Sequence, residues 1–104
     1  MAVQQRRVHD GELREMVRYF YALKDILRLR ILVALSGSGE MTVTELARTL
    51  HISQPLVSFH LNPLRSLGLV QVRRVGREVY CSVDISEIQR RHDEFMEMLT
   101  QAAP

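Results

Sequence analysis

Two groups of side chains in this sequence could bind another molecule. The first is small and mostly polar and comprises Ser53, Gln54, Pro55, Ser58 and Phe59. The second consists of the arginines Arg73, Arg74 and Arg77. Amide and hydroxyl side chains can hydrogen-bond the edges of DNA bases, and guanidinium groups bind phosphates. The two groups therefore indicate a nucleic acid as the ligand, provided that the fold holds them on one surface.

The first group falls in a pattern typical of two short helices joined by a tight turn at His51 and Ile52. Thr42 can cap the first helix, and Glu45 three residues later completes a capping box. The apolar residues of this helix recur at i, i+3, i+4 and i+7 and are Val43, Leu46, Ala47 and Leu50. That spacing forms one stripe, so we expect the helix to face a single core.

The second helix of the pair can begin at Ser53, because Pro55 then stands in the first turn, where no intrahelical bond is lost. Its inward residues are Val57, Leu61 and Leu64, and its outer face carries Gln54, Pro55, Ser58 and Phe59. A helix braced by another and carrying small polar residues outside is how a helix-turn-helix presents a recognition helix to a DNA groove. The alternatives are an αα-hairpin that only packs a core and, for Phe59, folding back onto the neighbouring helix.

After Gly68 the spacing of apolar residues changes from helical to alternating. The segment LVQVRRVGREVYCSV predicts a β-hairpin with Val75-Gly76 as a two-residue loop. In that register Val72 faces Val79, Val70 faces Cys81, and Arg73 lies opposite Glu78. Charge near a hairpin tip often serves only solubility. Directly behind a helix-turn-helix, however, a hairpin is a wing, and its three arginines can hold phosphates or enter a minor groove.

Two longer helices are predicted at the ends of the chain, at 10–23 and 85–101. Apolar residues line one side of the first helix at Leu13, Met16, Val17, Phe20 and Tyr21. The last helix repeats apolar residues and one histidine at spacings of three and four, a narrow seam typical of a helix–helix interface. We therefore expect these two helices to meet a partner subunit through Leu13, Met16, Phe20, Ile85, Ile88, His92, Phe95 and Leu99.

A further helix, ended by the Gly-Ser run at 36–39, follows the first. Leu27, Ile31 and Leu35 form its buried stripe, and we expect Arg28 and Arg30 to point elsewhere. Residues 1–7 are polar with two arginines and nothing to bury, so we expect a flexible arm there.

Length and composition indicate one domain spanning residues 1–104 with a small core. The net charge is only +2, so a DNA-binding surface depends on where the arginines lie. The single cysteine excludes an internal disulfide and, with no apolar run of membrane-spanning length, favours a cytoplasmic protein without membrane contact. No nucleophile with its base, glycine-rich phosphate loop or acid pair stands out, so we expect no catalytic residues and no enzyme.

From Ala22 to about Val83 the chain resembles the ArsR/SmtB family of winged-helix repressors. LKDILRLRIL resembles the opening of the family's second helix, with Arg28 before the Ile-Leu pair. The segment from Ser58 to Leu61 carries a Ser-x-His-Leu signature, and VRRVGREVYCSV resembles the family's wing. The resemblance implies a mainly α fold with a small β-hairpin, in the order α-α-α-α-β-β-α, dimerised through the first and last helices. His60, within the signature, is expected to brace the helix or to contact phosphate.

The residues that bind metals in many members of this family are missing. Cysteines that hold thiophilic ions there correspond to Thr42 and Thr44 here, and hydroxyl groups do not hold such ions. Other members bind zinc on the last helix, where this chain offers Asp84 with Ser86 and a lone His92. We therefore predict no metal site and no cofactor. The alternative is a non-standard site in which His92 joins Glu87, or joins His9 and Asp10 of another subunit.

Cys81 is predicted to face inward on its strand. A thiol sensor usually needs a resolving cysteine, and this chain has none, so we expect a small core residue rather than a redox switch. Pro63 falls inside the predicted recognition helix and removes one backbone bond, so we expect a kink near Asn62.

These patterns and the family resemblance together predict a homodimeric transcriptional repressor that binds double-stranded DNA. Its two recognition helices would lie about one helical turn apart on a palindromic operator. The expected DNA contacts are Thr42, Ser53, Gln54, Pro55, Ser58, Phe59, His60, Arg73, Arg74 and Arg77. The alternatives are a winged-helix module that binds a protein and a metal-responsive repressor that uses His92. The residues identify no inducer.

Overall fold

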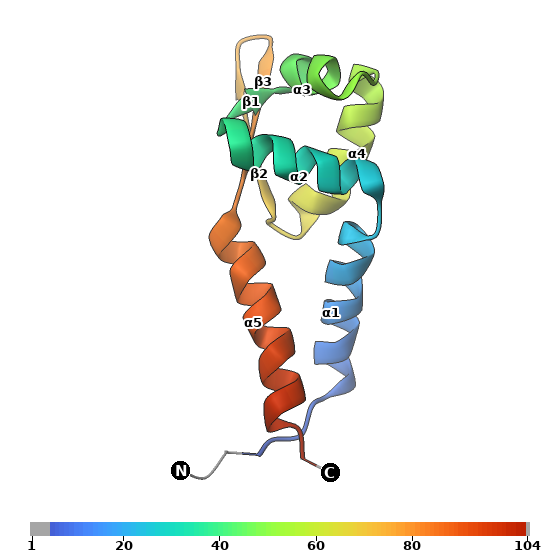
Figure 1. The fold of residues 1–104 in the computed structure, drawn as a ribbon, viewed down its shortest axis with the longest axis vertical. Helices are drawn as coiled ribbons and strands as arrows, with labels where there is room; N and C mark the ends of the chain where they lie inside the picture. Colours follow the sequence, from blue (N-terminus) through green and yellow to red (C-terminus); the bar gives the residue numbers. More distant parts are fainter. Residues whose placement is uncertain (1–4, 104) are drawn as a thin grey trace.

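In the computed structural model, which describes residues 5–103, five helices and a small sheet form a head on a stalk (Figure 1). The elements are α1 (Asp10–Leu23), α2 (Ile26–Ser38), β1 (Met41–Thr42), α3 (Val43–Leu50), α4 (Gln54–Ser66), β2 (Val70–Val75), β3 (Glu78–Val83) and α5 (Ile85–Gln101). The stalk is made of α1 and α5, which extend from the head and give the molecule its long axis of 53 Å. No helix among the described residues is long and apolar enough to cross a membrane.

The α3–α4 pair has the local structure that its residues predict. The Oγ1 of Thr42 accepts a hydrogen bond from the backbone N–H of Glu45 over 3.0 Å, and the backbone N–H of Thr42 donates to the Glu45 carboxylate, so the capping box is present. His51 ends α3 in the left-handed conformation, with φ 56°. The Oγ of Ser53 then caps α4 by accepting from the N–H of Leu56. Pro63 lies within α4 and does not end it.

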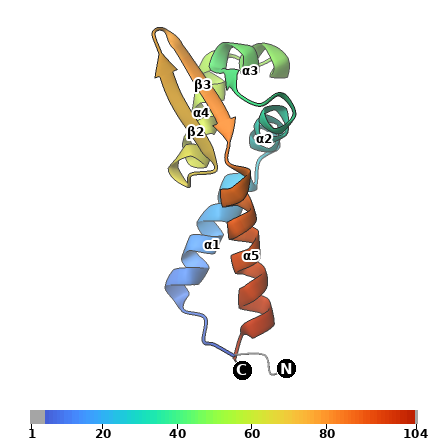
Figure 2. The ribbon, with the colours of Figure 1, turned by 90° about the vertical axis from the view of Figure 1, so that its left-hand side faces the viewer.

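The hairpin of β2 and β3 projects from the head, with its tip at the end of the molecule opposite the stalk (Figure 2). Its loop is Gly76-Arg77 and not Val75-Gly76, so the predicted register is wrong by two residues and Arg73 lies opposite Tyr80. The reason is the glycine: Gly76 takes a φ of +59°, which suits the first loop position of a type II′ turn. Because the shift is even, the apolar residues still share one face.

The sheet contains a third strand that the sequence analysis did not predict. Met41 and Thr42 of β1 pair with Cys81 and Tyr80 of β3, which gives the order β1-β3-β2. Two residues are too few for an alternating pattern to be visible. The strand matters because it leads directly into α3, so the helix-turn-helix and the wing are joined through one sheet.

The core of the head lies between the helices and the apolar face of this sheet. The inward stripes predicted for α3 and α4 are confirmed, since Leu46, Val57, Leu61 and Leu64 are all buried. The largest fully buried side chains also include Tyr19, Ile31, Leu35, Leu69, Val70 and Cys81. The polar residues Arg28, Thr42 and His60 are buried too. Arg28 was predicted to point away from the core.

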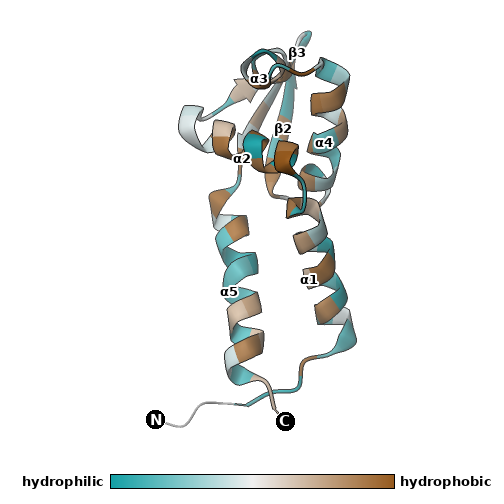
Figure 3. Ribbon diagram, turned by 45° about the vertical axis from the view of Figure 1, so that its right-hand side comes forward, coloured by the Kyte–Doolittle hydropathy of each residue, from teal (hydrophilic) through white to brown (hydrophobic). Residues whose placement is uncertain are grey.

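The stalk helices have the predicted bounds but a different packing face. The face of α1 that is buried carries Met16, Tyr19 and Ala22. The rings of Tyr19 and Phe20 lie edge-on to those of His92 and Phe95 on α5, at 5.3 and 5.0 Å between centroids. Hydrophobic residues recur along both helices (Figure 3), and periodicity alone did not single out the residues of α1 that meet α5 within the same chain.

The expected arm at 1–7 is only partly within the described residues. Residues 1–4 lie outside them, whereas Arg6 is held firmly and is not part of a free arm. Its backbone hydrogen-bonds to Gln101, the last residue of α5, and to Ala103 just after the helix, and its guanidinium pairs with Glu12 at 2.9 Å. The ion pair raises the pKa of Arg6 and lowers that of the Glu12 carboxyl. The far ends of α1 and α5 are therefore tied together.

Candidate nucleic-acid interface

The outer face of α4 presents the polar group that the sequence analysis singled out. With Val57, Leu61 and Leu64 turned into the core, the exposed side chains of this region include Ser53, Gln54, Pro55, Ser58 and Phe59. Phe59 is 63% exposed, so it does not fold back into the core, although its ring lies edge-on to that of His60 at 5.2 Å. An exposed phenylalanine among hydroxyl and amide groups can contact the methyl group of thymine in a major groove.

A groove runs between α4 and the wing. Its lining from the helices comprises Val43, Thr44, Gln54, Pro55, Ser58, Leu61, Asn62 and Arg65. Its lining from the hairpin comprises Val72, Arg74, Arg77, Glu78 and Val79. The fold thus brings the two predicted groups together, although about 20 residues of chain separate them. The helix wall offers amide and hydroxyl groups and the guanidinium of Arg65. The hairpin wall offers two guanidinium groups beside the carboxylate of Glu78. Side chains of these kinds can contact base edges and phosphates.

Three groove residues were missed by the sequence analysis: Thr44, Asn62 and Arg65. A helical spacing could have found two of them, because Asn62 and Arg65 continue the row of Gln54 and Ser58 at steps of four, four and three. Pro63 between them drew attention to the helix backbone instead. Arg65 adds a third basic group to the groove beside Arg74 and Arg77.

Arg73 does not belong to this groove, contrary to the sequence prediction. Successive residues of a strand point to opposite faces, so Arg73 lies on the other side of the sheet from Arg74. Its guanidinium donates to both carboxylate oxygens of Glu40, at 2.6 and 2.7 Å, and lies 4.5 Å from the centroid of the Tyr80 ring. The hydrogen bonds from Arg73 lower the pKa of the Glu40 carboxyl, so both partners are charged at neutral pH. Arg73 ties the wing to the residue before β1.

Thr42 and His60, which were also predicted to contact DNA, lie in the interior of the chain. Both are buried, and both use their polar atoms inside the chain. Thr42 caps α3, as described above, and the Nδ1 of His60 accepts a hydrogen bond from Arg28. The prediction that His60 braces the helix is the one that the contacts favour. A buried side chain already occupied by an internal bond cannot reach a phosphate without rearrangement.

The side chains considered as possible metal ligands lie apart from one another or are engaged in other contacts. The Oγ1 of Thr42 is occupied by the capping box, and Thr44 lines the groove. His92 is exposed on α5, where its ring contacts Tyr19. Within residues 5–103 no three His, Cys, Asp or Glu side chains gather closely enough to hold an ion. Burial raises the pKa of the Cys81 thiol to about 11, so the sulfur stays protonated at neutral pH and is a poor ligand or nucleophile.

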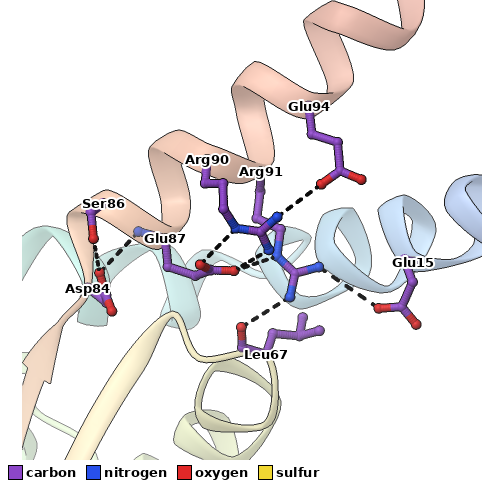
Figure 4. Close-up of polar contacts among 8 residues, drawn as sticks. All are labelled: Glu15, Leu67, Asp84, Ser86, Glu87, Arg90, Arg91 and Glu94. Atoms are coloured by element: carbon purple, nitrogen blue, oxygen red, sulfur yellow. Dashed lines mark hydrogen bonds and ion pairs between the residues drawn. The ribbon is translucent and has the colours of Figure 1, made fainter.

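The stalk is joined to α4 by a cluster of charged residues in the N-terminal half of α5 (Figure 4). Arg91 donates to the carbonyl oxygen of Leu67, the C-cap residue of α4, and to the carboxylate of Glu87. Hydrogen bonds from Arg90, and then from Arg91, lower the pKa of Glu87 to about 2, so this carboxylate remains charged over the physiological range. These contacts hold the C-terminal end of α4, and Ser53 caps its N-terminal end.

Comparison with known proteins identifies relatives of this chain. The sequence pattern of the bacterial regulatory proteins of the arsR family matches residues 25–72. A transcriptional repressor SmtB homolog from Synechocystis sp. is 36% identical over 91 residues, which cover 88% of this chain and 68% of that protein.

Two solved structures share the fold over most of their length. One is an ArsR-like transcriptional regulator from Rhodococcus sp., with a TM-score of 0.74, 31% identity, and coverage of 85% of this chain and 82% of that one. The other is the homodimeric winged helix-turn-helix DNA-binding domain of a possible ArsR-family regulator from Mycobacterium bovis, solved by NMR. It has a TM-score of 0.71 and 29% identity, and it covers 92% of this chain and 88% of that one.

Proposed function

This chain belongs to the ArsR family of transcriptional regulators and is not an enzyme, and from that premise we propose that it is a homodimeric repressor that binds a palindromic operator. The observation that carries the proposal is the groove between α4 and the wing. It joins Gln54 and Ser58, which can read base edges, to Arg65, Arg74 and Arg77, which can hold phosphates. Because the ligand is DNA, we infer that the protein acts in the cytoplasm.

The stalk supports the proposed dimer. Large apolar side chains remain exposed on its two helices in a single chain: Leu13, Val17, Phe20, Tyr21, Ile85, Met96 and Leu99. Exposed apolar side chains in this number on two helices are typical of a protein–protein contact. The relative from Mycobacterium bovis is described as a homodimer. We therefore propose that Leu13, Phe20, Ile85 and Leu99 meet a second copy, with Ile88, His92 and Phe95 beside them, whereas Met16 is buried within its own chain.

The experiment that tests this function is selection of bound duplexes from a random-sequence library, followed by titration of the selected duplex and of random DNA. We expect the selected sequences to share an inverted repeat with half-sites about one helical turn apart. Affinity for both DNAs should fall severalfold or more as salt rises, because phosphate contacts release counterions. Absence of enrichment, together with salt-independent binding, would instead favour a winged-helix module that binds protein.

Phe59→Ala should weaken binding to the selected duplex by about 1–3 kcal/mol, because one base contact is lost, and should hardly change binding to random DNA. Fluorescence titration with the two duplexes measures both effects. The matched control is Val33→Ala, which shortens an exposed apolar side chain on a different helix, α2. Equal weakening on both DNAs, or a large fall in melting temperature, would mean that Phe59 serves the fold.

DNA binding should not require a metal ion, because hydroxyl groups stand where thiolate ligands would be needed. Chelator-treated protein is titrated with the selected duplex, with and without zinc, nickel or cadmium. We expect affinities that agree within about threefold. A change of tenfold or more, about 1.4 kcal/mol of coupling, would revive the metal-sensing alternative. Loss of that change in His92→Ala would then assign it to His92.

A further inference from the structure

A buried polar pair joins α2 to the recognition helix. Arg28 on α2 is 9% exposed and His60 on α4 is 7% exposed. The Nε–H of Arg28 donates to the Nδ1 of His60 over 3.4 Å, between residues 32 positions apart in the chain. Neither residue lines the groove between α4 and the wing. The pair therefore lies directly behind the proposed DNA-reading face without being part of it.

Arg28 also connects this pair to the stalk. Its guanidinium donates to the carbonyl oxygen of Tyr21, in the last turn of α1, over 3.3 Å, and lies 5.8 Å from the centroid of the Tyr21 ring. A guanidinium taken out of water needs partners for its N–H groups, because an unpaired buried charge is strongly unfavourable. Arg28 finds them on α1 and α4 at once. One side chain of α2 therefore contacts both α1 and α4.

Asp25 is the second charged group beside the imidazole. Its Oδ1 lies 3.6 Å from the Nδ1 of His60 and accepts the backbone N–H groups of Leu27 and Arg28, as the N-cap of α2. The bond from the N–H of Arg28 is the main reason why the pKa of the Asp25 carboxyl lies below its usual value, so Asp25 is anionic at neutral pH. Among the described residues, the charged groups in contact with His60 are these two residues of α2, while Phe59 of α4 contributes only its ring.

We propose that Arg28 and His60 are positioning residues for the recognition helix and that the contact between them is released when His60 gains a proton. The inference rests on the proposed function. Neutral His60 can accept at Nδ1, and the proton then resides on Nε2. Protonated His60 has no acceptor left, carries a charge that repels Arg28, and can donate from Nδ1 to Asp25 instead. Arg28 then loses its contact with α4, and the helix loses a constraint on its orientation.

The DNA experiment compares His60→Asn and His60→Ala with the wild type on the selected duplex and on random DNA. Asparagine can offer an oxygen near the place of Nδ1 but does not titrate. At about pH 8 we expect His60→Asn to bind nearly as the wild type does, and His60→Ala to bind the selected duplex about tenfold more weakly with little change on random DNA. Arg30→Ala removes an exposed arginine from α2, the helix that carries Arg28; it is the control and should change the affinity for neither duplex.

Lowering the pH gives a second measurement of DNA affinity, which would not depend on His60 if this residue had only a structural role. From about pH 8 to about pH 5 the wild type should lose about tenfold more affinity for the selected duplex than His60→Asn does. Identical pH profiles of the two proteins would overturn the switch, and unchanged binding by His60→Ala would overturn the positioning. If His60→Ala does not fold, the comparison of the wild type with His60→Asn still tests whether DNA affinity depends on protonation of His60.

An NMR titration without DNA separates this inference from the proposed function. As the pH is lowered, protonation of His60 should shift the amide signals of α4 and the signal of the Arg28 Nε–H, because the contact between the two side chains is lost. The α4 amides of His60→Asn should stay in place over the same range. Titration of His60 without movement of the α4 signals would disprove the inference even if DNA binds. Failure to bind any DNA would disprove the proposed function and leave this result standing.

Discussion

Leu99→Glu is expected to split the dimer and to remove most of the operator affinity. Leu99 is 61% exposed in one chain and lies near the far end of α5, so a carboxylate there does not disturb the core of the head. In the proposed dimer, however, the same carboxylate would be buried without a partner, which is strongly unfavourable. We expect dimerisation to weaken by roughly 100-fold, or about 3 kcal/mol.

The loss of operator affinity follows from the symmetry of the proposed complex. A dimer binds both half-sites as one unit, whereas a monomer must bind each half-site separately and loses the gain of effective concentration, commonly about 100-fold or more. Sedimentation velocity gives the oligomeric state, and titration of the selected duplex gives the affinity. Thr100→Glu adds the same charge at the adjacent exposed position and serves as the control. A Leu99→Glu protein that remains dimeric with full affinity would show that the interface lies elsewhere.

Leu99 is a better position for this test than Phe95, although both belong to the predicted seam. The ring of Phe95 packs edge-on to that of Phe20 in the same chain, at 5.0 Å between centroids. A glutamate at Phe95 would therefore loosen α1 from α5 before any second subunit is considered. Monomers formed in that way would report on the stalk and not on the dimer contact.

Replacing Arg74 and Arg77 together by alanine should weaken binding to the selected duplex and to random DNA alike. Two lost phosphate contacts correspond to roughly 30-fold in affinity near physiological salt and to a decrease of about 1.8 in the slope of log affinity against log salt. Titration of both duplexes at several salt concentrations measures both quantities. Equal weakening is expected because phosphate contacts carry no sequence information.

Arg73→Ala is the matched control for this pair. Arg73 is the third arginine of the same wing, but its guanidinium is held by Glu40 and stacked on Tyr80 on the opposite side of the sheet. Its removal should leave the salt slope nearly unchanged. A slope change as large as that expected for one groove arginine would mean that Arg73 leaves Glu40 to bind phosphate, and the assignment of the DNA-facing side of the wing would then be wrong.

Local patterns of the sequence predicted much of this fold because short-range physics decides them. The capping box at Thr42, the cap at Ser53 and the inward stripes of α3 and α4 involve residues a few positions apart, whose relative placement follows from helix geometry alone. The bounds of α1 and α5 were predicted correctly for the same reason. The exposure of Gln54, Ser58 and Phe59 then followed, because a short helix cannot bury every face.

The wing was predicted as a hairpin but not in its register. Alternation assigned Val72 and Cys81 correctly to the apolar face, because a strand has period two. The choice of partners depended on which two residues form the loop, and that choice was decided by the positive φ of Gly76. In the observed register the residue opposite Arg73 is Tyr80 and not Glu78, so the contacts expected for Arg73 changed as well.

The sequence by itself determined the helices, the inward faces of α3 and α4 and the family to which this chain belongs. Only the tertiary structure decided which polar residues are free to bind DNA. Arg28 and Arg73 look alike in the sequence and could equally have been unpaired; their partners, His60 and Glu40, lie 32 and 33 residues away. Such pairs form when packing removes the groups from water or brings opposite charges together, and no local periodicity records which distant residues will meet.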